Sequence, residues 1–151
     1  MQYTIYKPTK RGTGGAFKFN LHKEGKFSFL QGAKQVAPMG SDRVFGWGKD
    51  ESVNVKMSAE DLGGILSVIM RFNPSISLYH QTENDNKIIE FVHVPDRKGY
   101  SLKISQKRGD SEAIQVFAGI TYAEAVVLKG YCEAVIRENL WNNANRQSKD
   151  S

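Results

Sequence analysis

The sequence of 151 residues predicts an α+β fold in which two packed antiparallel β-sheets are accompanied by two helices. Three observations predict it. Apolar residues alternate with polar ones along most of the chain, which is typical of half-buried strands. The spacing becomes helical after Ser58 and again after Thr121. These positions lie 63 residues apart, and a shift of that length superposes the two apolar helical stripes, so we expect a duplicated unit of four strands and a helix.

The first unit is expected at about 15–73, after a short strand or arm at 3–7 and a basic glycine loop. Phe17 and Phe19 alternate with Lys18 and Asn20, which indicates a strand with one face toward the core. Phe27 and Phe29 alternate in the same way with Lys26 and Ser28, and are expected to face the core as well. The strands expected in this unit are 16–22, 26–36, 43–47 and 52–57.

Ser58 and Asp61 form an N-terminal capping pattern for the first helix, which Asn73-Pro74 ends. The second unit, at 75–141, repeats this order: Thr121 and Glu124 form a capping box after strands at 76–81, 87–94, 99–106 and 113–120. We therefore expect one domain at 1–141, followed by a flexible polar tail at 142–151.

Composition excludes several classes of protein. The single Cys132 rules out an intrachain disulfide and a cysteine-built zinc site. No run of 18 apolar residues is present and the first residues lack an apolar leader segment, so we expect no membrane association and a cytoplasmic location.

No set of residues has the spacing that catalysis or metal binding needs. His22, His80 and His93 are scattered over predicted strands without a partner at metal-binding spacing. The glycines at 12–15 precede a strand, whereas a dinucleotide-binding glycine loop follows a strand and opens a helix. We expect a protein that is not an enzyme and has no cofactor and no metal.

Basic and aromatic residues point to an anionic partner with bases to stack on. Residues 1–56 carry ten Lys or Arg and four acids, whereas the remainder is close to neutral and the whole chain has a net charge of +5. Sixteen aromatic residues lie mostly on predicted strands. Proteins bind single-stranded nucleic acid through this combination, because cations hold the phosphates while rings stack on bases.

The residues expected to contact nucleic acid lie on outward strand positions or in adjoining loops. Trp47, Tyr79 and Phe91 are the stacking candidates, because each shares a strand face with polar residues. The polar candidates are Lys10, Arg11, Lys18, Asn20, Lys26, Ser28, Lys34, Arg43, Lys49, Asn54, Lys56, Lys98 and Lys103.

Several short motifs, in matching order, resemble the Whirly family of single-stranded DNA-binding proteins. They are YTIYK at 3–7, the basic glycine segment 11–19, FGWGK at 45–49, VNVKMSAEDLGGI at 53–65, SLYH at 77–80, ITYAE at 120–124 and the closing Leu140-Trp141. One position departs from the pattern: plant members carry a lysine where this chain has Gly14.

The resemblance implies two four-stranded sheets, each followed by a helix, and a homotetramer assembled through the helices. It also implies single-stranded DNA as the partner, bound with little sequence preference during replication, recombination or repair. Apolar helix residues would then bury against the sheets or form the oligomer interface: Leu62, Ile65, Ile69, Leu128, Cys132 and Ile136.

Alternatives remain open at the level of sequence. The same fold could bind or anneal RNA, or regulate transcription by preferring a promoter element. In a different class, the chain could be a structural oligomer without a nucleic-acid role. Its binding would then be weak and indifferent to whether the nucleic acid is single-stranded.

Overall fold

The first sheet has five strands in the computed structural model, which describes residues 1–22, 25 and 27–150, with only the helical backbone of 144–150. β1 pairs antiparallel with β2, which pairs with β3, and β3 pairs with both β4 and β5. The segment at 3–7 is thus an integral strand and not an arm, which gives this sheet one strand more than expected. The strands are β1 (Gln2–Lys7), β2 (Gly15–Leu21), β3 (Ser28–Gln35), β4 (Phe45–Gly46) and β5 (Ser52–Met57).

The second sheet is a four-stranded antiparallel meander in chain order, as the sequence predicted. A 3-10 turn, η1 (Pro95–Arg97), connects its two longest strands. Lys98 follows this turn in the left-handed conformation, with φ of 54°. The strands are β6 (Ser75–Gln81), β7 (Asp85–Val94), β8 (Gly99–Arg108) and β9 (Ile114–Thr121).

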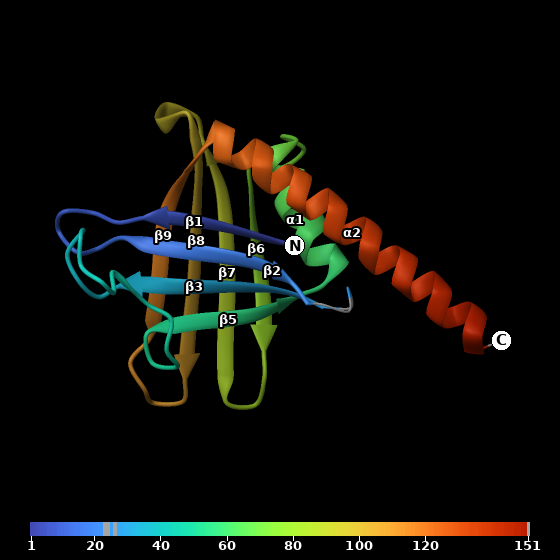
Figure 1. The fold of residues 1–151 in the computed structure, drawn as a ribbon, viewed down its shortest axis with the longest axis horizontal. Coiled ribbons are helices and arrows are strands. Elements are labelled where there is room, and N and C mark those ends of the chain that lie inside the picture. Colours follow the sequence, from blue (N-terminus) through green and yellow to red (C-terminus); the bar gives the residue numbers. More distant parts are fainter. Residues whose placement is uncertain (23–24, 26, 151) are drawn as a thin grey trace.

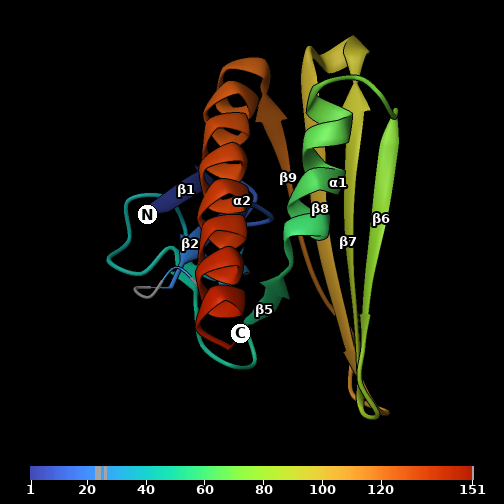
Figure 2. The same cartoon turned by 90° about the vertical axis from the view of Figure 1, so that its right-hand side faces the viewer.

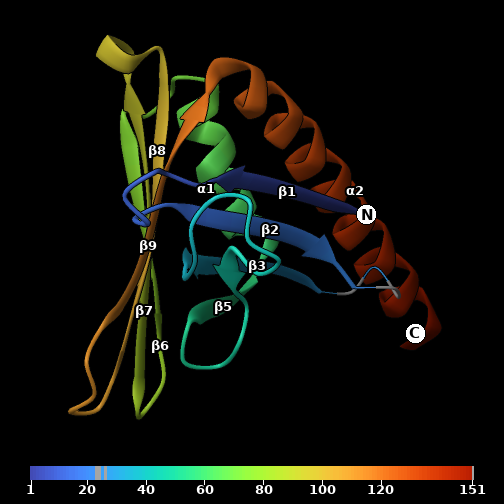
Figure 3. The same cartoon turned by 60° about the vertical axis from the view of Figure 1, so that its left-hand side comes forward.

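The two sheets pack face to face with crossing strand directions. β1, β2, β3 and β5 run across β6–β9 in Figure 1, and Figure 3 shows the first sheet standing out from the plane of the second. Phe17 and Leu30 of the first sheet and Leu102 and Ile104 of the second are all fully buried. They belong to one continuous core, which the alternating pattern specified.

Two helices close one side of this arrangement. α1 (Ala59–Ile69) lies between α2 (Tyr122–Asp150) and the second sheet, as Figure 2 shows. The Ser58 hydroxyl accepts from Asp61 N and the Asp61 carboxylate accepts from Ser58 N, so the predicted cap is present in both directions.

Four of the six helix residues assigned to an oligomer interface lie in the core of the single chain. Leu62, Ile65, Leu128 and Cys132 are each 0% exposed, so of the two expected alternatives these four bury within the chain and are not available for an interface. The apolar stripe of each helix is buried by packing within the protomer. Ile69 and Ile136 are partly buried against the same core.

The polar segment from residue 142 continues as helix. α2 runs to Asp150, where a tail outside regular structure was expected. The Asn142 side-chain amide donates to the Gly25 carbonyl at 2.8 Å, so this part of α2 contacts the segment that connects β2 and β3. Figure 1 shows α2 extending beyond the sheets toward the C-terminus.

The start of α2 is tied to the first sheet by a carboxylate. Lys7 Nζ lies 2.6 Å from Glu124 Oε1, and Thr121 N donates to the same oxygen at 2.9 Å. Burial alone would raise the pKa of Glu124, but the hydrogen bonds from Lys7 and Thr121, with the Lys7 charge, hold it below the usual 4.5. Glu124 therefore couples β1, the end of β9 and α2.

Replacing Glu124 with Gln is expected to lower the free energy of unfolding at pH 7 by about 1 kcal/mol, the typical contribution of a cap with a partly exposed ion pair. A carboxylate with a lowered pKa stabilises the fold above its unfolded pKa, and this is lost as the pH falls below 4.5. Urea denaturation at pH 7 and pH 4 should show a smaller pH dependence for the variant. An unchanged pH dependence would show that this carboxylate does not contribute.

Candidate nucleic-acid interface

The face of the first sheet that points away from the second sheet, here the outer face, carries polar and aromatic side chains in rows. One row aligns Asn20, Phe29 and Lys56, because Asn20 pairs with Phe29 and Phe29 with Lys56. The next row aligns Lys18, Gln31 and Asn54. Alternation in β2, β3 and β5 creates these rows, since the intervening residues point into the core.

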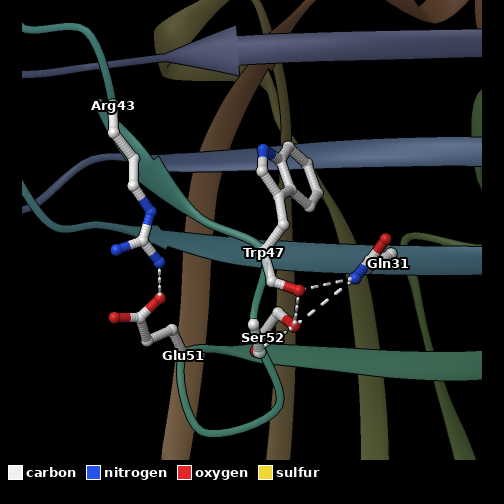
Figure 4. Close-up of polar contacts among 6 residues, drawn as sticks. Gln31, Arg43, Trp47, Glu51 and Ser52 are labelled. Carbon is white, nitrogen blue, oxygen red and sulfur yellow. Dashed lines mark hydrogen bonds and ion pairs between the residues drawn. The ribbon is translucent and has the colours of Figure 1, made fainter.

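Trp47 lies over this face at the end where β4 pairs with β3. Its ring covers the small side chains of Ala16 and Ala33, which are both 0% exposed although they point outward. The Trp47 carbonyl accepts from the Gln31 amide at 3.3 Å and from the Ser52 hydroxyl at 3.1 Å (Figure 4). The turn between β4 and β5 is thus held through the backbone carbonyl of Trp47 and not through its ring.

A hollow of about 470 Å³ opens beside this ring and is here called the Trp47 hollow. It is largely apolar, with two rings close together: the Tyr6 and Phe45 centroids are 5.9 Å apart. Tyr6 is 59% exposed and Met39 55%, and both line the same hollow, so they form a contiguous apolar surface of the kind that marks binding sites. The lining residues include Tyr6, Pro8, Met39, Arg43, Phe45 and Trp47.

Two lysines on the outer face lie against rings. Lys18 Nζ is 4.3 Å from the centroid of Trp47, and Lys56 Nζ is 3.7 Å from the centroid of Phe27. Neither forms an ion pair within the described part of the chain. Each lysine therefore lies beside an aromatic ring. In a single strand the lysine can bind a phosphate while the ring stacks on the neighbouring base.

The loops at the Trp47 end of the sheet add further basic residues. Lys10 and Arg11 lie exposed between β1 and β2, and Lys34 is exposed near the end of β3. Lys49 is exposed in the turn before β5. Arg43 forms an ion pair with Glu51, drawn in Figure 4, so part of its charge is neutralised within the chain.

Three candidates belong to the second sheet or to the turn between its strands. Tyr79, 65% exposed, and Lys103 lie on the outward face of the second sheet, and Lys98 follows η1. Lys103 Nζ lies 2.9 Å from Glu90 Oε2 on the neighbouring strand, so its charge is partly neutralised. The predicted contacts therefore fall on two faces, with most of the unpaired basic residues on the first sheet.

Two predicted contacts are wrong. Phe91 is 0% exposed and stacks on Tyr100, with centroids 5.2 Å apart and planes 7° from parallel, so no base can reach its face. Ser28 is also 0% exposed, and its hydroxyl lies 3.2 Å from that of Tyr131 in α2. Lys26 lies outside the described residues.

Four outer-face residues were missed by reasoning from sequence. Phe29 and Gln31 lie between Lys18 and Lys56, Phe27 is 41% exposed, and Tyr6 lines the Trp47 hollow. The available signal was Leu30. Leu30 is apolar like its neighbour Phe29, and only one of the two can face the core. Because Leu30 faces the core, alternation places Ser28 on the inward side as well. Phe27 and Phe29 then point outward.

Gly14 has a steric reason to be glycine. A Cβ at this position would lie 2.1 Å from the Lys7 carbonyl oxygen and 2.8 Å from Pro8 Cα. Its N–H donates to the Gln35 side chain at 2.9 Å, which also accepts from Thr9 N. The lysine that plant Whirly proteins carry here would thus require the backbone to shift.

Within the described residues, no three His, Cys, Asp or Glu side chains converge in a way that could hold a metal ion. Over their described residues, neither helix is both long and apolar enough to cross a membrane. Cys132 is buried in the core, and burial raises the pKa of its thiol to about 12.

Solved structures share this fold at low sequence identity. WHY3 from Arabidopsis thaliana superposes with a TM-score of 0.70 at 19% identity, over 100% of this chain and 95% of that one. WHY1 from the same plant gives 0.70 at 20% identity, over 99% and 90%. The chain has a Whirly-like fold. No protein-family model and no curated protein matches the sequence.

The Whirly-like fold extends to proteins of other descriptions. The plant transcriptional regulator PBF-2 superposes with a TM-score of 0.71 at 19% identity, over 97% of this chain and 86% of that one. The Trypanosoma bruciei MRP1/MRP2 structures give 0.72 at 15% identity, over 92% and 85%. The fold expected from the sequence motifs is confirmed, and the fifth strand of the first sheet is the one addition.

Proposed function

We propose that this protein binds single-stranded DNA with little sequence preference, through the outer face of the first sheet. The observation that carries the proposal is the pairing of unneutralised lysines with rings: Lys18 lies over Trp47 and Lys56 over Phe27. Such a face holds a phosphate and stacks a base without reading base edges. In duplex DNA the bases are paired and stacked inside the helix. A duplex can therefore contact only the lysines of this face and not its rings.

The proposed role is to protect or organise exposed single strands in replication, recombination or repair, in the cytoplasm and without catalysis. We also propose a homotetramer formed through the helices. Large apolar side chains support this: Val126 and Val127 of α2 are 68% and 52% exposed, and Phe72 after α1 is 74% exposed. These residues replace the buried ones assigned to the interface from sequence.

A fluorescence titration with a labelled single-stranded oligonucleotide, its duplex and the matching RNA, at several salt concentrations, tests the proposal. We expect tighter binding to single-stranded DNA than to duplex, with a salt slope of about 0.7 per phosphate neutralised. Light scattering on the same samples gives the oligomeric state. Equal and weak binding to all three would leave a structural oligomer as the better description.

RNA is the second candidate partner, because base stacking and phosphate contacts serve both nucleic acids. Equal affinity for single-stranded RNA and DNA in the same titration would favour a general single-strand binder. A clear preference for RNA would replace the DNA proposal. Preference for a promoter element over other sequences of the same base composition would instead favour the role of transcription regulator, the description that PBF-2 carries.

A further inference from the structure

A second hollow lies at the opposite end of the outer face from Trp47. It encloses about 490 Å³, a size typical of sites for small organic groups, and is here called the Tyr79 hollow. Phe27, Lys56, Tyr79, Asn139 and Leu140 are among its lining residues. The hollow therefore joins the start of β3 and the end of β5 to β6 of the second sheet and to α2.

The walls of the Tyr79 hollow expose apolar and aromatic surface. Phe27 is 41% exposed, Leu140 60% and Tyr79 65%. The Lys56 ammonium lies directly over the Phe27 ring, at the border between the hollow and the outer face. A flat aromatic occupant could cover these side chains while its own charged group remains beside Lys56.

The polar groups of this hollow include donors, such as Lys56 and Tyr79, as well as acceptors. Asn139 is only 8% exposed, and its side-chain oxygen has no hydrogen-bond partner among the described residues. Glu60 and Asp61 also line the hollow. The Asp61 carboxylate already accepts from Ser58 N and lies 3.0 Å from His80 Nε2. An unpaired buried acceptor is costly, which indicates a donor that is supplied from outside.

We propose that the Tyr79 hollow binds one unpaired nucleobase that carries an exocyclic amino group. The base stacks on the aromatic wall, its neighbouring phosphate lies at Lys56, and its amino group donates to Asn139 once the side-chain amide turns toward the hollow. Uracil and thymine present a carbonyl where cytosine presents an amino group, and that carbonyl would face the Asn139 side-chain oxygen. This inference rests on the proposed function and adds a base preference to it.

The two hollows can be filled by one strand. The seven steps from Gln35, beside β4, to Ser28, beside Phe27, span roughly 23 Å at about 3.3 Å per residue. At the stacked spacing of about 3.4 Å per nucleotide, about seven nucleotides cover that length. A strand that stacks at Trp47 can therefore cross Lys18, Gln31 and Phe29 and place a base in the Tyr79 hollow.

The test compares the affinities of 12-nucleotide oligodeoxycytidine and oligodeoxyuridine, whose bases differ at the amino group and at the adjoining ring nitrogen, an acceptor in cytosine and a donor in uracil. The wild-type protein is expected to bind oligodeoxycytidine about five- to tenfold more tightly, the effect of one buried acceptor satisfied. Tyr79→Ala is expected to weaken binding of both by about 5- to 150-fold, the range for one stacked base. Phe117→Ala removes an exposed ring from the same face of the second sheet, but from the opposite edge strand β9, and this matched control should bind like wild type.

Asn139→Leu separates base recognition from folding, because it removes the unpaired acceptor and keeps the branched shape of the side chain. It should abolish the preference for cytosine with the melting temperature kept or raised. Equal wild-type affinities for the two oligonucleotides, or wild-type affinity in Tyr79→Ala, would overturn this inference and leave the proposed function standing. If the wild-type protein binds neither oligonucleotide, both fail.

Discussion

Replacing Trp47 with alanine is expected to weaken binding of single-stranded DNA by about 5- to 150-fold, because one stacked base contributes about 1–3 kcal/mol. The ring is the largest at the Trp47 hollow and the partner of Lys18. The backbone carbonyl of residue 47, which accepts from Gln31 and Ser52, is kept by alanine. The turn before β5 should therefore survive, and the loss should be one of affinity. The measurement is the titration at constant salt, with circular dichroism to confirm the fold.

Trp141→Ala is the matched control for this prediction. Trp141 is 65% exposed on α2 and lines neither hollow. Its removal takes away the same ring from a position outside both hollows, so affinity should stay at the wild-type value. The salt slope should be close to wild type in both variants, since neither loses a cation. If both variants lose affinity equally, the outer face of the first sheet is not the specific binding surface.

Most of the fold was predictable because its signals are local. The caps at Ser58 and Thr121 place both helix starts within the few residues that form them. The period of two marks β5–β9 because one face of each is buried by the other sheet or by the helices. The role of β1 was less clear, because a strand at a sheet edge gains its identity only from pairing with β2.

The residues of the outer face were harder to predict, because alternation along a strand separates two sets of side chains but does not show which set faces the core. In β3, Phe29 and Leu30 are both apolar, and only pairing with β5 and the contact between Ser28 and Tyr131 decide between them. The Trp47 hollow joins Tyr6 to Phe45, about 40 residues apart. The Tyr79 hollow joins β3, β5, β6 and α2. Such sites arise from tertiary packing and leave no local signal.

Helix interiors show the same limit in another form. An apolar stripe predicts that a helix face is buried, but it does not say against what. Leu62 and Cys132 are covered within the chain, whereas Val126 and Val127, on the other side of α2, are exposed. The sequence could therefore indicate the number of helices and their apolar faces, and only the packed structure shows which apolar residues remain for a partner chain.

An aromatic residue on a strand can belong to the core or stack on bases, and replacing Phe91 distinguishes the two roles. Because Phe91 is a core residue, its removal should lower stability and leave binding intact. Phe91→Ala deletes a fully buried ring stacked on Tyr100 and leaves a cavity, so the free energy of unfolding should fall by about 3–5 kcal/mol. For a chain of this length that lowers the melting temperature by roughly 6–20 °C.

The affinity of the folded variant for single-stranded DNA, measured well below its melting temperature, should equal that of wild type. Phe91→Leu, which keeps most of the volume, should recover much of the stability and bind equally well. Tyr79→Ala reverses the pattern on the same sheet: its ring is exposed, so its loss should lower affinity at little cost in stability. A stable Phe91→Ala protein with weakened binding would mean that this ring is presented to bases, and that the second sheet opens when it binds a strand.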